Sequence, residues 1–238
     1  MIAPRVVVAH EAEVIREAAL RVVRRAGYAG IGVTEGESTR VLLDWPPHPE
    51  ALIVDVGLPG ALGYELCDEI RRRSLPTKVI LIASVYSRTA YKRRPSSLYG
   101  ADDYIEQHHI PDALARKLAR FVAPPRPLGP DPAGDLNEEE QATIRDAAEH
   151  RLAAPGEGES LREHARRLAR LLMADIVLYN GSVVEQALRD GDLEERLAAD
   201  LKAGRELFAG RAPAGTPEDE DYIGDALNEF VLSRRETP

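Results

Sequence analysis

The first half of the chain alternates short apolar runs with amphipathic stretches, a pattern typical of strands followed by helices. The apolar runs predict strands at Arg5–Ala9, Gly30–Thr34, Ala51–Val54, Lys78–Ala83 and Asp102–Ile105. The stretches after them predict helices at Ala12–Ala26, Ser38–Asp44, Leu62–Arg73, Arg88–Tyr99 (interrupted by Pro95) and Pro111–Val122. Five such units in a row predict a sheet of parallel strands joined by right-handed crossovers.

The run Ala51–Val54 ends abruptly on Asp55, and a loop rich in glycine and proline follows. In open parallel sheets, ligands bind outside the carboxyl ends of the strands. Asp55 is therefore either a cap at a strand–helix junction or a functional carboxylate, and both interpretations stay open at this point. Other residues follow strand ends and are expected at the same edge of the sheet: His10, Glu11, Ala83, Ser84 and Gln107.

The second half of the chain has the period of amphipathic helices. Before it, residues 123–134 hold five prolines and two glycines, which predict an extended, semi-rigid linker. Ser160 with Glu163 predicts a capping box at one helix start. The predicted helices are Glu138–Leu152, Leu161–Tyr179, Val183–Arg189, Leu193–Ala209 and Asp221–Arg235. We therefore expect an α/β domain at 1–122, a linker at 123–135 and a small all-α bundle at 136–238.

Charge is divided unevenly along the chain. Residues 1–122 have a net charge of +2 and residues 123–238 a net charge of −11. Because phosphate contacts dominate nucleic-acid affinity, this acidic second half argues against a DNA-binding output. No signal peptide opens the sequence, and no apolar run reaches the ~20 residues of a membrane span, so we expect a cytoplasmic protein. The single cysteine, Cys67, excludes a disulfide framework within the chain and is expected to be buried.

Residues 5–122 resemble the receiver domain of two-component response regulators, which implies a flavodoxin-like, doubly wound five-stranded sheet. Asp55 stands in the phosphoacceptor position, His10-Glu11 in the place of the acidic pair, and Gln107 in the place of a lysine. Ala83, with Ser84 beside it, occupies the threonine or serine position. The surrounding matches are Leu58-Pro59-Gly60, Gly63 and Gly100–Ile105.

The resemblance implies a Mg²⁺ site, with Glu11, Asp55, Gly57 and His10 as candidate ligands. His10 is a poor ligand for a hard cation, and Gln107 offers hydrogen bonds without charge. Ala83 has no hydroxyl. Asp55 is therefore either a phosphoacceptor served by a histidine kinase or part of a pseudo-receiver that works as a scaffold. A DNA-binding transcriptional regulator is the third and disfavoured alternative.

Three further sets of residues have two interpretations each. His164 is either a phosphotransfer histidine or, as we favour, an ordinary half-exposed helix residue. His108-His109, with His10, form either a transition-metal site or, as we favour, surface and loop-packing histidines. The basic run Lys92-Arg93-Arg94 is either a solvated face or a docking surface for a protein partner.

Segments of the second half resemble a helical module of deltaproteobacterial regulatory proteins, and no biochemical activity comes with that resemblance. These segments are His164–Arg170, Asp175–Asn180 and Gly204–Phe208. The whole chain is thus interpreted as a signalling protein with no enzymatic output, which acts on protein partners and on neither nucleic acid nor membrane. The sequence leaves its oligomeric state open.

Overall fold

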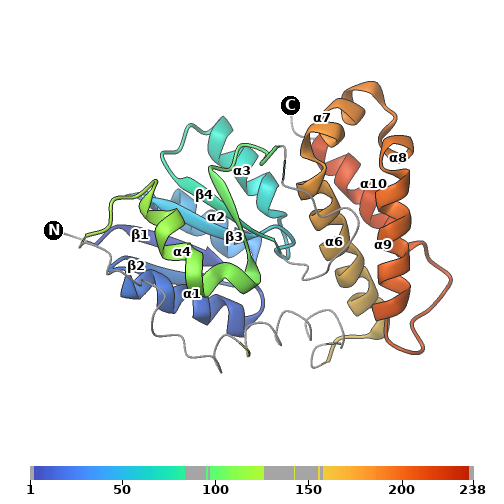
Figure 1. Cartoon of the computed structure of the whole chain (residues 1–238), viewed down its shortest axis with the longest axis horizontal. Coiled ribbons are helices and arrows are strands. Elements are labelled where there is room, and N and C mark those ends of the chain that lie inside the picture. Colours follow the sequence, from blue (N-terminus) through green and yellow to red (C-terminus); the bar gives the residue numbers. More distant parts are fainter. Residues whose placement is uncertain are drawn as a thin grey trace. The chain divides into compact units, whose positions relative to one another are not determined.

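The computed structural model describes residues 3–83, 95, 97–125, 142, 155 and 158–235 (Figure 1). The chain forms two compact units. The first holds Met1–Tyr86 and Leu98–Glu149, and the second holds Ser87–Ser97 and His150–Pro238. The predicted helix at 138–152, the linker beyond residue 125 and most of the predicted helix at 88–99 lie outside the described residues. The proposed domain boundaries therefore stay a prediction.

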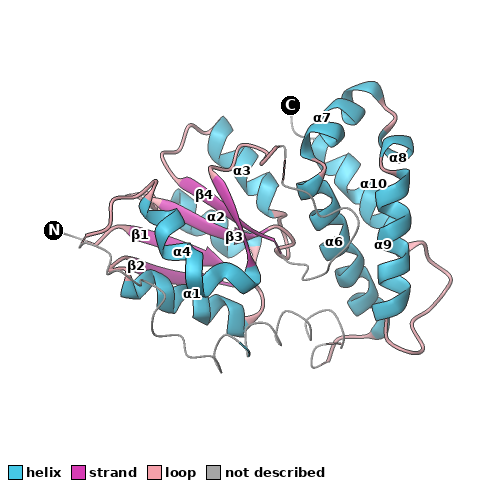
Figure 2. Ribbon diagram, in the orientation of Figure 1, coloured by secondary structure: helices cyan, strands magenta, loops and turns pink. Residues whose placement is uncertain are grey.

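The described part of the first unit alternates strands and helices as predicted (Figure 2). Its strands are β1 (Arg5–Ala9), β2 (Ala29–Val33), β3 (Ala51–Asp55), β4 (Lys78–Ala83) and β5 (Asp103–Glu106). Its helices are α1 (Glu13–Arg25), α2 (Gly36–Asp44), α3 (Gly63–Arg72), the 3-10 turn η1 (Gln107–His109) and α4 (Ile110–Ala119). β3 is one residue longer than predicted, so Asp55 belongs to the strand itself.

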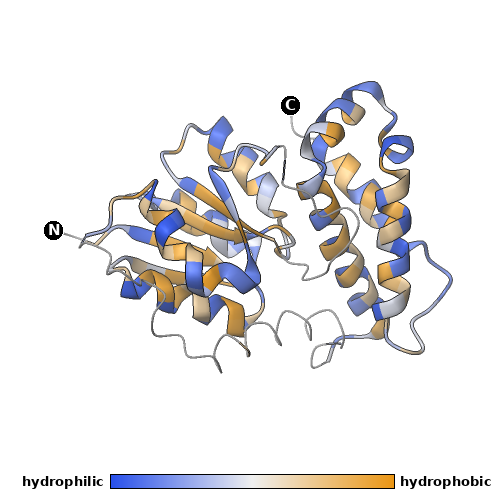
Figure 3. Cartoon of the chain, viewed as in Figure 1, coloured by the Kyte–Doolittle hydropathy of each residue, from blue (hydrophilic) through white to orange (hydrophobic). Residues whose placement is uncertain are grey.

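All five strands are parallel and lie in the order β2-β1-β3-β4-β5. This is the flavodoxin-like order, and it confirms the predicted fold class. Figure 3 shows the strands as predominantly apolar, which agrees with a sheet covered on both faces. α1 packs against α4, and both contribute to one core cluster with the strand residues Val6, Val8, Ile53, Ile80 and Ile82.

The described part of the second unit is helical. It contains α6 (Leu161–Tyr179), α7 (Gly181–Asp190), α8 (Leu193–Arg196), α9 (Ala198–Arg211) and α10 (Tyr222–Arg235). The predicted capping box is confirmed: the Glu163 N–H donates to Ser160 Oγ (3.2 Å), and the Ser160 N–H donates to Glu163 Oε2 (2.9 Å). α6 packs against both α9 and α10. In α10 the apolar residues that face the core are buried, and Val231 beside them is half-buried; the buried ones are Tyr222, Ile223, Ala226, Leu227 and Phe230.

One helix prediction is wrong. The stretch Leu193–Ala209 forms two helices, because the chain leaves helical geometry at Leu197, where φ is −95° and ψ is 6°. The side chain of Leu197 is completely buried, so this break places an apolar residue in the core. Arg196 stabilises the break by pairing with Asp190 (2.6 Å) and Asp192 (2.8 Å).

Two expectations from composition are also addressed by the structure. Cys67 is buried on α3, as predicted. Among the helices in the described ranges, none combines the length and apolar character needed to cross a membrane.

Candidate functional site at the carboxyl edge of the sheet

Asp55 is the last residue of the central strand β3, and its side chain is completely buried. The Gly57 N–H donates a hydrogen bond to Asp55 Oδ1 (3.2 Å), which fixes one carboxylate oxygen. The next helix begins close against this strand end: a Cβ on Gly63 would lie 2.8 Å from the Asp55 carbonyl oxygen. Glycine is therefore required at position 63, and the loop of residues 56–62 is drawn tightly over the end of β3.

His10 follows β1, the neighbour of β3 in the sheet, and is also completely buried. Its Nδ1 atom accepts a hydrogen bond from the Ala12 N–H (3.0 Å). In a neutral imidazole the other nitrogen then carries the proton. That nitrogen, Nε2, lies 3.7 Å from Asp55 Oδ2, so the ring directs an N–H group toward the carboxylate.

Gln107 begins the 3-10 turn after β5 and is 2% exposed. Its amide nitrogen lies 3.0 Å from His10 Nε2, while its Oε1 is buried without a hydrogen-bond partner. Because His10 Nε2 carries one proton, turning the Gln107 amide over lets Oε1 share that N–H with Asp55 Oδ2. His10 thus sits between Gln107 and Asp55, and the three form a buried polar cluster.

The other candidate site residues contribute less to the cluster of His10, Asp55 and Gln107. Ala83 ends β4 and is 3% exposed, so its methyl group belongs to the buried edge. Glu11 is half-buried, and the Arg16 guanidinium donates to its backbone oxygen (3.1 Å). Gly57 contributes its N–H to Asp55, as described above. Ser84 lies outside the described residues.

Two supporting groups were missed by sequence reasoning. The backbone N–H of Ala12 decides which nitrogen of His10 carries the proton. Arg16, on the first turn of α1, donates to the backbone oxygen of His10 (3.0 Å) as well as to that of Glu11. Backbone contacts of this kind leave no residue-type signal in the sequence.

The groups around Asp55 do not fit the Mg²⁺ site that the resemblance to receiver domains implies. Mg²⁺ requires oxygen ligands in near-octahedral geometry, whereas the His10 ring presents an N–H to Asp55. Over the residues that the structure describes, no group of three or more His, Cys, Asp and Glu side chains is arranged to hold a metal ion. The predicted ligands Glu11, Asp55, Gly57 and His10 therefore stay a prediction without geometric support.

The other candidate histidines, His108, His109 and His164, contact neighbouring side chains of the fold. The rings of His108 and His109 lie 3.9 Å apart, and His108 Nδ1 is 3.5 Å from Glu106 Oε2. His164 is completely buried rather than half-exposed as predicted. Arg167 donates to its Nδ1 (2.8 Å), and Arg167 also pairs with Glu159 (2.8 Å), so the helix side chains cover the ring.

At the amino ends of β4 and β5, ion pairs connect the strands to their neighbours. Asp102, in the turn before β5, accepts from the Val79 N–H (2.8 Å) and pairs with Arg71 (2.6 Å) and Lys78 (3.1 Å). Burial alone would raise the pKa of Asp102, but these three donors outweigh it and hold the pKa below its usual value. Asp102 therefore anchors β4 and β5 as a carboxylate.

The first half of the chain is similar to known proteins. The model of the response regulator receiver domain matches residues 6–119. The transcriptional regulatory protein TcrA of Mycobacterium tuberculosis is 32% identical over 136 residues, which cover 56% of this chain and 49% of TcrA. The phosphate regulon transcriptional regulatory protein PhoB of Escherichia coli K12 is 28% identical over 153 residues, 64% of each protein. The chain thus spans about half to two-thirds of these relatives.

Solved structures are also similar. The response regulator TrrA of Thermotoga maritima, in complex with Mg(2+)-BeF, matches 50% of this chain and 99% of its own with 24% identity and a TM-score of 0.43. DrrB, an OmpR/PhoB homologue of Thermotoga maritima, matches 50% of this chain and 52% of its own with 23% identity and a TM-score of 0.41. The described helices that follow residue 158 are not part of the family match.

Proposed function

Residues 6–119 are a response regulator receiver domain, and from this premise we propose a signalling protein that acts through protein–protein contacts without phosphorylation of Asp55. It has no enzymatic output of its own. The helical second half passes the signal to a protein partner. The sequence left two interpretations of Asp55 open, a phosphoacceptor and part of a pseudo-receiver, and this proposal takes the second.

The observation that carries the proposal is the buried cluster of His10, Asp55 and Gln107, none of which is more than 2% exposed. A phosphoryl group on Asp55 would bring three anionic oxygens into this space. Such a group is stabilised by cations and by charge-assisted hydrogen bonds, whereas the cluster supplies a neutral imidazole N–H and a neutral amide. The cluster therefore favours a carboxylate that stays unmodified.

The test is incubation of the full chain with acetyl phosphate, and separately with beryllofluoride, in the presence of Mg²⁺. We expect neither a mass increase that depends on Asp55 nor a change in the near-ultraviolet spectrum. Asp55→Asn is the matched control for the mass measurement. A phosphoryl adduct that is present in the native chain and absent in Asp55→Asn would overturn the proposal.

A second candidate function is favoured by one observation. Asp55 ends the central strand at the ligand-binding edge, and the Gly57 N–H orients its Oδ1, as a phosphoacceptor requires. In this alternative the double variant Gln107→Lys/Ala83→Thr gains a cation and a hydroxyl. Its phosphorylation rate and beryllofluoride affinity should then exceed those of the native chain. No difference between the two proteins would count against this candidate.

For the output we propose a protein partner rather than nucleic acid, although the relatives TcrA and PhoB are named transcriptional regulators. The support is the net charge of −11 on residues 123–238, which repels DNA phosphates. The predicted docking run Lys92-Arg93-Arg94 lies outside the described residues. A titration with random duplex DNA tests the choice, and salt-sensitive micromolar binding without a recovered protein partner would revive the transcriptional alternative.

A further inference from the structure

An acidic loop joins α9 to α10 in the helical unit (Figure 1). It comprises residues 212–221, which we call the strap, and it ends in four consecutive acidic residues: Glu218, Asp219, Glu220 and Asp221. None of the strap residues is buried, so apolar packing contributes little to its placement.

Two arginines on the first half of α6, Arg162 and Arg166, hold the strap, and we call them the arginine pair. Arg162 donates to both carboxylate oxygens of Asp219 (3.1 Å each) and also donates to Glu220. Arg166 donates to both carboxylate oxygens of Glu220 through Nε (3.2 Å) and Nη2 (3.0 Å). The Arg162 guanidinium holds the pKa of Asp219 below its usual value. Since a planar guanidinium recognises a carboxylate specifically when it binds both oxygens, the arginine pair has the geometry of a carboxylate-binding site.

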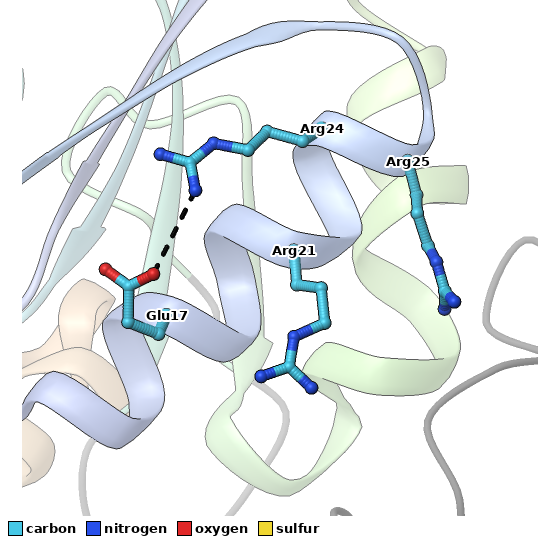
Figure 4. A pocket seen from close by; sticks show the side chains of 4 residues that line it. All are labelled: Glu17, Arg21, Arg24 and Arg25. Carbon is cyan, nitrogen blue, oxygen red and sulfur yellow. Dashed lines mark ion pairs between the residues drawn. The ribbon is translucent and has the colours of Figure 1, made fainter.

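The arginines of α1 provide a contrast with this arrangement. They line a shallow hollow of about 380 Å³ together with one glutamate of the same helix (Figure 4): Glu17, Arg21, Arg24 and Arg25. The printed pair there, Arg24 with Glu17, spans 4.0 Å and joins two residues of one helix. The arginine pair of α6 instead contacts a separate segment of chain through several short hydrogen bonds. It is therefore the more specific of the two arrangements.

The strap leaves one polar group beside it unsatisfied. Tyr222 follows the strap and is 4% exposed, and its hydroxyl has no hydrogen-bond partner among the residues that the structure describes. Burial raises the pKa of that hydroxyl, as do the carboxylates of Glu220 and Asp219, whereas the arginine pair lowers it. The hydroxyl thus lies within electrostatic range of the arginine pair. Because a buried hydroxyl without a partner is costly, a ligand oxygen that accepts from Tyr222 has an advantage over the strap.

The hold of the strap on α6 is weak enough for exchange. Arg166 is 53% exposed and Asp219 is 66% exposed, and an ion pair of such side chains shifts an equilibrium by about five-fold at most. Asp221 at the end of the strap pairs with Arg205 on α9 (2.9 Å) and accepts from the Gly224 N–H (3.1 Å), so it stays with α10. α10 itself packs against α6 through buried apolar residues. The strap can therefore leave the arginine pair while α10 stays folded.

We propose that Arg162 and Arg166 bind an acidic peptide segment of a protein partner, and that the strap occupies this site as an internal substitute until the partner displaces it. The occupant is an acidic peptide because the ligand that the structure shows is itself a run of acidic residues. The surrounding charge agrees, since residues 161–170 carry four arginines and one glutamate. The inference deepens the proposed output through a protein partner and rests on that output, but it does not depend on the state of Asp55.

A peptide titration of the full chain tests the site. The probe is a fluorescein-labelled peptide with the sequence of residues 212–221, used at low salt. In the strap variant, Asp219→Asn/Glu220→Gln, the arginine pair loses its tethered competitor, so the peptide should bind at least five-fold more tightly than to the native chain. The matched control, Glu194→Gln/Glu195→Gln on α8, makes the same change of net charge and should bind as the native chain does. Equal affinities for the two variants would overturn the proposal.

Further substitutions locate the bound peptide. Arg162→Gln/Arg166→Gln, added to the strap variant, should abolish the gain in affinity. Arg170→Gln/Arg189→Gln, which removes two exposed arginines of α6 and α7, should retain it. Circular dichroism establishes that the variants are folded. A gain that survives the loss of the arginine pair would place the peptide elsewhere and contradict the proposal.

Protease sensitivity gives a second readout on the native strap. Glu218 and Glu220 are cleavage sites for a glutamate-specific protease, and mass spectrometry measures cleavage after them. Arg162→Gln/Arg166→Gln should release the strap and accelerate this cleavage at least three-fold at low salt, whereas Arg170→Gln/Arg189→Gln should not. Equal cleavage rates in the two variants would show that the arginine pair does not hold the strap, and the proposal would fail.

Two other occupants of the site are distinguishable. If the strap of a second copy fills it, the native chain sediments as a dimer and the strap variant as a monomer, and this result would replace the partner peptide with a second copy. Binding of random duplex DNA to the strap variant that Arg162→Gln/Arg166→Gln abolishes would replace it with nucleic acid. The proposed pseudo-receiver function fails on a different readout, a phosphoryl adduct on Asp55, so the two failures are distinguishable.

Discussion

The polar cluster at the carboxyl edge of the sheet and the ion pairs between α6 and the segment before α10 lie in opposite environments. In the α/β unit, His10, Asp55 and Gln107 are at most 2% exposed, and His10 Nε2 lies 3.0 Å from Gln107 Nε2 and 3.7 Å from Asp55 Oδ2. In the helical unit, ion pairs lie at the surface: Arg166 pairs with Glu220 (3.0 Å) although its side chain is 53% exposed. Arg162 pairs with the same carboxylate and with Asp219.

This difference decides how each set of polar groups responds to its surroundings. The stability of a buried polar cluster, in a medium of low dielectric constant, depends little on salt. It depends strongly on each hydrogen-bonding group, because losing one leaves its partner unsatisfied. Exposed ion pairs are screened by salt, and each contributes little to stability. The buried cluster should therefore respond to single substitutions, and the exposed ion pairs to solution conditions.

The largest effect is expected from a substitution at Gly63. An alanine methyl at Gly63 would meet backbone atoms of Asp55 and Val56 at 2.8 and 3.1 Å. Backbone cannot move aside cheaply, so Gly63→Ala should lower the free energy of unfolding by about 1–3 kcal/mol. Urea denaturation followed by circular dichroism measures this change. A variant as stable as the native chain would show that α3 can shift along the strand end.

Gly204→Ala is the matched substitution in the helical unit. Its methyl would meet only the terminal Cδ1 of Ile176, at 2.9 Å. A side-chain end can turn away, and alanine gains about 1 kcal/mol of helix propensity over glycine. The free energy of unfolding, measured from the helical circular dichroism signal, should therefore change by less than about 1 kcal/mol.

The next effect comes from the buried carboxylate. Asp55→Asn keeps the shape and one acceptor oxygen for the Gly57 N–H while it removes a buried negative charge. Because burying a carboxylate costs more than burying a neutral amide of the same shape, we expect unfolding at pH 7 to require about 1–2 kcal/mol more free energy than in the native chain. Thermal and urea denaturation provide the measurement. Destabilisation by Asn would mean that the charge itself contributes to the fold.

A smaller, pH-dependent effect is expected at Tyr28. Burial raises the pKa of its hydroxyl to about 12, and the hydroxyl donates to Val122. The folded state therefore keeps a proton that the unfolded chain releases near pH 10. The contribution is fully present below pH 10 and is lost as the pH rises through about 12. Tyr28→Phe should cost about 1 kcal/mol at neutral pH and remove this part of the alkaline loss, which denaturation curves at pH 9 and 11.5 detect.

The smallest effect is expected at the surface of the helical unit. Arg166→Gln removes the pair with Glu220 and should lower stability by less than about 1 kcal/mol at low salt. At 1 M NaCl the native chain and the variant should unfold at the same denaturant concentration, because the Debye length falls to about 3 Å. A difference that persists at high salt would show that the pair is effectively buried.

Local patterns were sufficient to predict much of the architecture. β1 and β4 have the predicted bounds, and the Ser160–Glu163 capping box forms as expected, because apolar runs and capping residues act over a few positions. The placement of Asp55 at the ligand-binding edge follows from the same patterns and the parallel topology.

Long-range packing settled what local patterns left open. His10 and Gln107 are 97 residues apart, and their contact depends on the order of the strands and on the backbone of Ala12. Leu197 breaks a helix whose sequence period is continuous, because burying its side chain in the core outweighs the helical geometry lost there. His164 differs from these two, because the side chains that contact its ring, Arg167 and Glu159, are near neighbours in the sequence. The contact between His10 and Gln107 and the burial of Leu197 depend on tertiary packing, which a residue's type and its neighbours in the sequence do not specify.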